Sequence, residues 1–196
     1  ELLWSNANLP DESPLILILH GLSGSVSSSY VKRFMKAFND QGWRAVLMHF
    51  RSAGKELNRL ARAYHSGDTA DLDFAVNVLA QREPNTKKAV VGVSLGGNGL
   101  LKWLGEQGLQ SKITTAVAIS VPFVLNKLAD KMNIGFARIY QKRLLKQLKE
   151  IFARKMNQLS NPPDAVKKAA DCNCFWTFDH QVTAPLHGFN SAHTYY

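Results

Sequence analysis

The chain has 196 residues, of which 45% are hydrophobic and 20% are charged, and its formal net charge is +9. This balance excludes disordered, collagen-like and coiled-coil proteins, whose compositions are more biased. A chain of this length buries roughly 70% of its unfolded surface, enough for one core without disulfides or metals. Cys172 and Cys174 stand too close in sequence to bridge each other, and the longest early apolar run is too short for a membrane span. We therefore expect a cytoplasmic protein with free thiols.

The positive charge is concentrated in one part of the sequence. Residues 122–168 contain eleven basic and three acidic residues, whereas the rest of the chain contains thirteen basic and twelve acidic ones. The sequence thus predicts a nearly neutral body that carries one strongly basic segment.

Residues 1–121 alternate between strand and helix patterns. A continuous apolar run at residues 15–19 is typical of a strand buried on both faces, and apolar residues at helical spacing follow until Gly42. A polar stretch covers residues 51–68, and Asp68 or Thr69 is the expected cap of the helix after it. In chain order the patterns predict strand 15–19, helix 30–38, strand 44–50, helix 72–79, strand 88–93, helix 100–104 and strand 113–119.

Strands that alternate with helices indicate an α/β fold with a mostly parallel sheet and helices on both faces. In such a sheet, ligands bind at the carboxyl ends of the strands. The loops at residues 20–28, 50–68 and 93–95 are therefore expected to share one edge.

The pattern changes after Pro122. Apolar residues from Ile139 to Met156 recur at helical spacing and predict one basic amphipathic helix, which the sequence Asn161-Pro162-Pro163 ends. The last 30 residues are rich in aromatic side chains and show little period.

One sequence motif indicates a catalytic site. Gly92-Val93-Ser94-Leu95-Gly96 fits the pattern G-x-S-x-G, with a buried strand leading into the serine and a helix leading out of it. This context is typical of a nucleophile elbow, in which the serine sits on a tight turn at a helix N-terminus. The sequence therefore predicts Ser94 as a catalytic nucleophile.

A nucleophilic serine needs hydrogen-bond donors for the oxyanion that forms during the reaction. The backbone N–H of Leu95 directly follows the nucleophile. The loop His20-Gly21-Leu22 follows an earlier strand, and we expect the N–H of Leu22 to be the second donor. We expect His20 to shape this loop, and His65 and Asp68 to anchor the long loop around them.

Several further segments together resemble the YheT-like branch of the α/β-hydrolases, whose eukaryotic relatives are the ABHD1/ABHD3-type proteins. The resemblance covers nearly the whole chain. Its segments are residues 20–25 (HGLSGS), 48–51 (MHFR), 58–59 (NR), 64–68 (YHSGD), 92–98 (GVSLGGN), 121–123 (VPF), 135–140 (GFARIY) and 186–189 (LHGF).

The resemblance implies an α/β-hydrolase fold and a serine carboxylesterase that forms an acyl-enzyme on Ser94, with lipid-like esters among its substrates. It implies a core at residues 1–121 and a basic helical cap at residues 122–196. The triad acid and histidine of the family lie in motifs that this chain lacks, so we expect the first and last core strands to be absent and the chain alone to be inactive. His187 and His193 fall in the stretch that matches the cap.

A second hypothesis is a catalytically incomplete binding module that uses its basic cap on a membrane or on nucleic acid. The esterase hypothesis implies a small-molecule or lipid ester as partner, and it leaves room for peripheral membrane contact through the cap. We do not expect nucleic acid as a partner of an esterase. The histidines show no metal-ligand spacing, so we expect no metal and no cofactor.

Overall fold

The computed structural model describes residues 1–5 and 8–196 and divides them into two compact units. The first, termed the sheet unit, contains residues 1–50 and 65–121. The second, termed the helical unit, contains residues 51–64 and 122–196. The polar segment 51–64 thus belongs to the helical unit, although the sequence predicts it as part of the core at residues 1–121.

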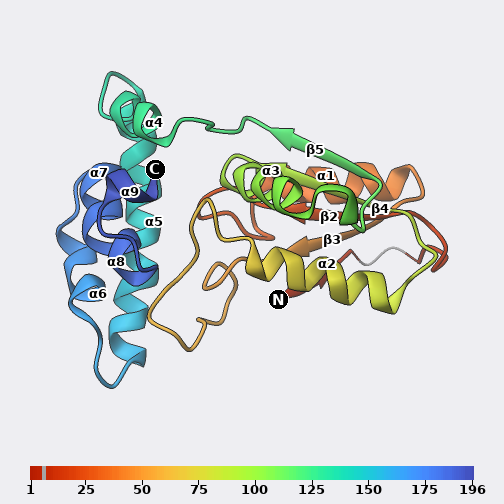
Figure 1. Ribbon diagram of the computed structural model, residues 1–196, viewed down its shortest axis with the longest axis horizontal. Coiled ribbons are helices and arrows are strands. Elements are labelled where there is room, and N and C mark those ends of the chain that lie inside the picture. The colour runs from red at the N-terminus through yellow and green to blue at the C-terminus, as the bar shows by residue number, and fades with distance from the viewer. Residues whose placement is uncertain (6–7) are drawn as a thin grey trace. The chain divides into compact units, whose positions relative to one another are not determined.

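The sheet unit is built on a five-stranded, mostly parallel sheet in the order β1-β3-β2-β4-β5 (Figure 1). β2, β3, β4 and β5 are parallel, and β1 pairs antiparallel with β3. All residues of β2 and β3 are buried, as expected for strands covered on both faces. The strands are β1 (Leu2–Trp4), β2 (Leu15–Leu19), β3 (Arg44–Met48), β4 (Lys88–Val93) and β5 (Thr115–Ile119).

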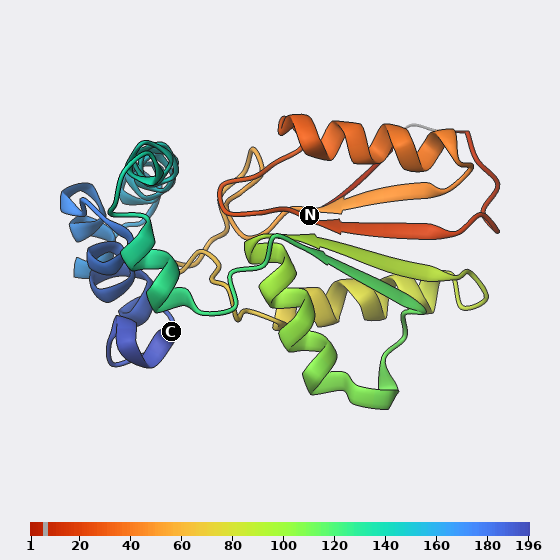
Figure 2. The same ribbon diagram turned by 90° about the horizontal axis from the view of Figure 1, so that it is seen from above.

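Helices cover both faces of this sheet. Figure 2 shows α1 (Ser29–Asp40) on one face, and α2 (Ala70–Arg82) and α3 (Leu95–Gln107) on the other. A short 3-10 turn, η1 (Gly108–Gln110), follows α3. α1 leads from β2 outward to β3, while α2 and α3 lead to β4 and β5 on the other side of β2. The connections therefore diverge between β2 and β4, and the loops after these two strands flank the crevice where such sheets bind ligands.

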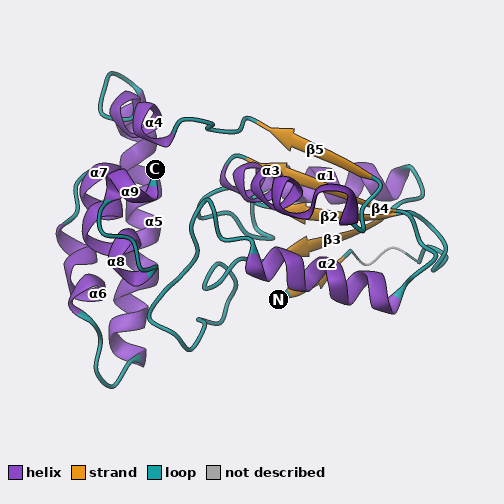
Figure 3. Ribbon diagram, in the orientation of Figure 1, coloured by secondary structure: helices purple, strands orange, loops and turns teal. Residues whose placement is uncertain are grey.

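The helical unit has no strand among the residues that the structure describes (Figure 3). Its longest element is α5, and shorter helical segments follow it. None of the described helices is long and apolar enough to cross a membrane. The elements are α4 (Leu125–Lys131), α5 (Ala137–Gln158), α6 (Asp164–Lys168), η2 (Ala169–Asp171), α7 (Phe175–Phe178), the π-helical turn η3 (Asp179–Thr183), α8 (Ala184–Leu186) and α9 (Ala192–Tyr195).

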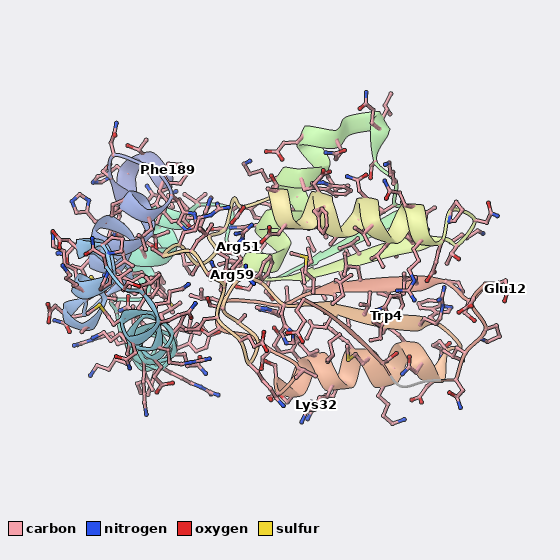
Figure 4. The ribbon with its side chains drawn as sticks, turned by 90° about the horizontal axis from the view of Figure 1, so that it is seen from below. Trp4, Glu12, Lys32, Arg51, Arg59 and Phe189 are labelled. Atoms are coloured by element: carbon pink, nitrogen blue, oxygen red, sulfur yellow. The ribbon has the colours of Figure 1, made fainter. Side chains whose placement is uncertain are left out.

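The α/β-hydrolase sheet predicted from sequence is confirmed, with one difference. A strand, β1, is present at the start of the chain, where none was predicted. Its Trp4 packs under the guanidinium of Arg82, which lies 5.4 Å from the ring centre (Figure 4 labels Trp4). The N-cap of α2 is Thr69, one of the two residues predicted for it, although its side chain makes no cap hydrogen bond.

A buried lysine joins segment 51–64 to α5. Lys155 is 1% exposed, and its ammonium donates to the side-chain oxygen of Asn58 (2.7 Å) and to the backbone carbonyls of Asn58 (3.3 Å) and Leu60 (2.7 Å). Burial, together with the charge of Arg51, lowers the pKa of Lys155 to about 8. Figure 4 shows Arg51 and Arg59 on the same segment. The ammonium group of Lys155 therefore fixes the segment by hydrogen bonds to three uncharged oxygen atoms.

Replacing Lys155 by methionine should destabilise the helical unit. The acceptors on Asn58 and Leu60 would lose their donor, which costs about 1–3 kcal/mol in unfolding free energy. The unfolded chain keeps the Lys155 proton up to the ordinary pKa of 10.5, whereas the native chain loses it near 8. The unfolded state thus binds more protons between these pH values, so the wild-type protein gains stability as pH rises through that window. Urea unfolding against pH should show this gain to be smaller in Lys155→Met.

The matched control is Lys146→Met, on an exposed position of the same helix. It should change the unfolding free energy by less than about 0.5 kcal/mol. Equal stability of the two variants would contradict a structural role for Lys155.

Candidate active site

Ser94 occupies a strained turn between β4, which ends at Val93, and α3, which begins at Leu95. Its backbone has φ +52° and ψ −117°, in a region that residues other than glycine rarely adopt. The Ser94 N–H donates to the carbonyl of Ile119 in β5 at 2.8 Å, which fixes the turn against the sheet. The serine is thereby held at the amino end of a helix, where the first N–H groups have no partner inside the helix.

The turn is possible because two glycines let backbone segments approach closely. A Cβ on Gly96 would lie 2.6 Å from the carbonyl oxygens of Leu19 and His20, and one on Gly92 would lie 2.6 Å from the carbonyl oxygen of Gly96. Neither position can hold a side chain without a backbone shift. The glycines of the motif therefore set the geometry of the elbow.

The loop after β2 passes beside the nucleophile. A Cβ built on Gly21 would lie 3.3 Å from the Cβ of Ser94 and 3.5 Å from the carbonyl oxygen of Val93. The residue after Gly21 is Leu22, one of the two predicted donors, and the other, Leu95, is the first residue of α3. The structure thus places the loop after β2 and the start of α3 at the carboxyl ends of β2 and β4, where Ser94 also lies.

His20 is a structural residue of this loop. It is fully buried, its Nε2 accepts the Phe50 N–H at 3.2 Å, and its Nδ1 lies 2.7 Å from the carbonyl oxygen of Gly21. The neutral ring with its proton on Nδ1 satisfies both bonds. Burial lowers the pKa of His20 to about 4, so the ring stays neutral at physiological pH. His20 joins the ends of β2 and β3.

Two other histidines of the sheet unit also use a ring nitrogen as an acceptor for backbone. His49 Nε2 accepts the Val26 N–H at 3.2 Å, and His65 Nδ1 accepts the Gly67 N–H at 3.1 Å. A neutral imidazole has only one acceptor nitrogen. In His20, His49 and His65 that nitrogen is engaged, so none of them is arranged to take a proton from a serine hydroxyl.

Tyr30 positions the loop, a role that sequence reasoning missed. Its hydroxyl oxygen accepts the Gly21 N–H at 2.9 Å, and it would lie 2.9 Å from a Cβ on Gly24. The residue fits the apolar stripe of α1, so nothing in the pattern separates it from a core side chain. Its bond holds Gly21, and hence the start of the loop, next to Ser94.

Known proteins share this fold and sequence. The profile of the alpha/beta hydrolase fold family matches residues 14–165. The chain is 36% identical to "Putative esterase YheT" of Escherichia coli, over 100% of this chain and 58% of that protein. It is 29% identical to the monoacylglycerol lipase of Saccharomyces cerevisiae, over 96% of this chain and 44% of that protein. It is 27% identical to phospholipase ABHD3 of Mus musculus, over 93% and 44%.

Two solved structures show the same fold at low sequence identity. Est1E of Butyrivibrio proteoclasticus, solved with bound ferulic acid, aligns with a TM-score of 0.55 at 17% identity over 67% of this chain and 52% of that one. A serine hydrolase without a lid from Xanthomonas campestris aligns with a TM-score of 0.50 at 19% identity over 62% and 54%. The chain spans about half the length of the curated relatives that it matches. It belongs to the alpha/beta hydrolase fold family, and its relatives include YheT and ABHD3, as its motifs predict.

Proposed function

We propose that the protein is a serine hydrolase that cleaves carboxylic acyl esters through an acyl-enzyme on Ser94. The observation that carries this proposal is the backbone of Ser94, held at φ +52° at the start of α3. Strain of this kind persists only where the surrounding structure enforces it, and it is concentrated at functional sites. The loop after β2 lies beside Ser94, which supports the proposed role of its backbone N–H groups as donors to the oxyanion.

In this mechanism the Ser94 Oγ attacks the ester carbonyl carbon and loses its proton to a general base. The carbonyl oxygen becomes an oxyanion, which accepts hydrogen bonds from the backbone N–H groups of Leu22 and Leu95. The dipole of α3 also stabilises this negative charge. Collapse of the intermediate breaks the bond to the alcohol, which leaves with the proton from the base. Water then attacks the acyl-enzyme in the same way and releases the acid.

The base and its carboxylate are proposed to come from outside the sheet unit. The acceptor nitrogens of His20, His49 and His65 are already bonded to backbone N–H groups. The resemblance likewise places the triad acid and histidine in other motifs.

The proposed substrates are lipid-like or small esters. The names of the relatives support this class, because they include an esterase, a monoacylglycerol lipase and a phospholipase. In this proposal, residues 122–196 act as a basic cap.

A fluorophosphonate probe tests the nucleophile. Incubated with the full-length protein, it should label Ser94, and peptide mass spectrometry should locate the adduct there. A matched control is Ser120→Ala. Ser120 also has a positive φ (+52°) and also follows a strand, yet it lies outside the motif. Labelling should survive this substitution and be lost in Ser94→Ala. No labelling of folded wild-type protein would reject the proposal and favour a binding module.

A further inference from the structure

An exposed apolar surface lies where α4 turns into α5. Ile134, Phe136 and Ile139, called the apolar tip, are 61%, 92% and 67% exposed. Single exposed apolar residues are common, but a cluster of large ones usually marks an interaction site. Figure 1 shows the turn at the end of the helical unit where α4 lies. Further exposed apolar residues stand nearby in sequence: Phe123, Val124, Leu128 and Tyr140.

A buried glutamine holds this turn in place. Gln141 is 3% exposed, and its amide nitrogen donates to the carbonyl of Met132 (3.1 Å) and to the side-chain oxygen of Asn133 (2.9 Å). Its side-chain oxygen accepts the Phe175 N–H at 2.8 Å. A satisfied buried network of this kind rigidifies the backbone around it. The tip is therefore presented in a fixed conformation.

Basic side chains share one face of α5 with Ile139, the residue of the apolar tip that lies in this helix. Residues three, four and seven positions after Ile139 share its side of the helix, and these are Lys142, Arg143 and Lys146, all exposed. The opposite side is buried within the unit, through Leu144, Leu145, Leu148 and Phe152. The outer face of α5 thus carries cations beside Ile139, and the rest of the apolar tip directly precedes this helix in the chain.

We infer that this face docks onto an anionic lipid bilayer. Amphipathic helices with apolar groups and Lys or Arg lie in the bilayer interface, with the apolar groups below the headgroups and the cations at anionic lipids. Two acids stand near the cations in sequence: Asp130, which accepts the indole N–H of Trp176 at 2.7 Å, and Glu150, one turn beyond Lys146. Two acids cannot balance the charge of this segment, so the face keeps an excess of positive charge.

Other occupants suit this face less well. Covering it with protein would bury the cations, which is costly unless carboxylates pair with them. A nucleic acid would use the cations but not the apolar tip. An anionic bilayer uses both kinds of side chain at once.

This inference goes beyond the proposed hydrolase chemistry and does not depend on it. Vesicle binding should be the same for wild-type protein and for Ser94→Ala. Failure of either proposal can therefore be recognised separately.

Vesicle co-sedimentation of the full-length protein provides the test. Binding should occur with phosphatidylcholine vesicles that contain about 30% phosphatidylglycerol, and it should weaken with salt because the anionic surface is screened. The double variant Ile134→Ser, Phe136→Ser should bind about tenfold more weakly, because it loses the inserted apolar groups. The triple variant Lys142→Gln, Arg143→Gln, Lys146→Gln should have an affinity for these vesicles that is lower by about tenfold or more.

Matched controls lie on exposed positions of the sheet unit. Phe74→Ser with Leu109→Ser removes two exposed apolar side chains, and the triple variant Lys32→Gln, Arg33→Gln, Lys87→Gln removes three exposed cations. Both should bind vesicles like wild-type protein. Circular dichroism should show all variants folded, since the altered side chains are exposed.

Three results would overturn the inference. The first is no binding of folded protein to anionic vesicles at low salt. The second is binding that the tip substitutions leave unchanged. The third is a concentration-dependent dimer that Phe136→Ser dissociates in the absence of vesicle binding, since the occupant would then be a second copy of the chain.

Discussion

Ser94→Ala should abolish most of the ester hydrolysis by the full-length protein. Removing the nucleophile of a serine hydrolase lowers kcat by about a thousandfold to a millionfold, because the remaining groups can stabilise charge but cannot form the acyl-enzyme. The loss should appear for every ester in a panel of p-nitrophenyl substrates of increasing acyl length. KM should change little where it reflects binding alone.

The Ser94 variant also tests what else the site does. Alanine keeps the Cβ, so the backbone of the elbow and its bond from the Ser94 N–H to Ile119 should persist. The unfolding free energy should therefore stay within about 1 kcal/mol of wild type. Activity above a tenth of wild type, with Ser120→Ala equally active, would show that another residue is the nucleophile.

Gly96→Ala should destabilise the sheet unit severely, although it adds only one methyl group. The new Cβ would stand 2.6 Å from the carbonyl oxygens of Leu19 and His20. These oxygens cannot retreat easily, because Leu19 pairs with Met48 of β3 on one side and with Gly92 of β4 on the other. We expect a loss of more than about 4 kcal/mol in unfolding free energy, or failure to fold. Urea unfolding and soluble yield would measure it.

Gly105→Ala is the matched control, because Gly105 lies in the same helix, α3. Apart from its chain neighbours and the nearby backbone of α3 itself, no atom of the described residues lies within 4 Å of a Cβ built at Gly105. Alanine is favoured over glycine inside a helix by about 0.5–1 kcal/mol, so this variant should be slightly more stable than wild type. Similar stability of the two alanine variants would mean that the approach of α3 to β2 is looser than the structure indicates.

The parallel sheet and the elbow could be predicted from sequence because both depend on local patterns. The runs at residues 15–19 and 88–93 consist mainly of apolar residues, and the structure has strands with these same bounds. Ser94 could be found because its glycines, a strand and a helix follow one another without interruption. Each of these signals lies within a few residues of the element that it specifies.

The features that sequence reasoning missed depend on contacts between distant residues. β1 has three residues, too few for a periodic signal, and it pairs with a strand more than forty positions away. The helices near the C-terminus have only three to five residues each, again shorter than a pattern can register. Lys155 appears as one more cation in a basic helix, and only the fold reveals its three oxygen partners.

The position of β5 at one end of the sheet order has a consequence for handling the protein. β5 pairs with β4 on one side, and its residues Thr115, Ala116 and Val117 are exposed. An uncovered edge strand presents a row of backbone donors and acceptors that can template pairing with a strand of another molecule. Wherever β5 stays uncovered, molecules should therefore aggregate by pairing their edge strands. Added salt should not reverse such aggregates as readily as it reverses contacts between charged surfaces.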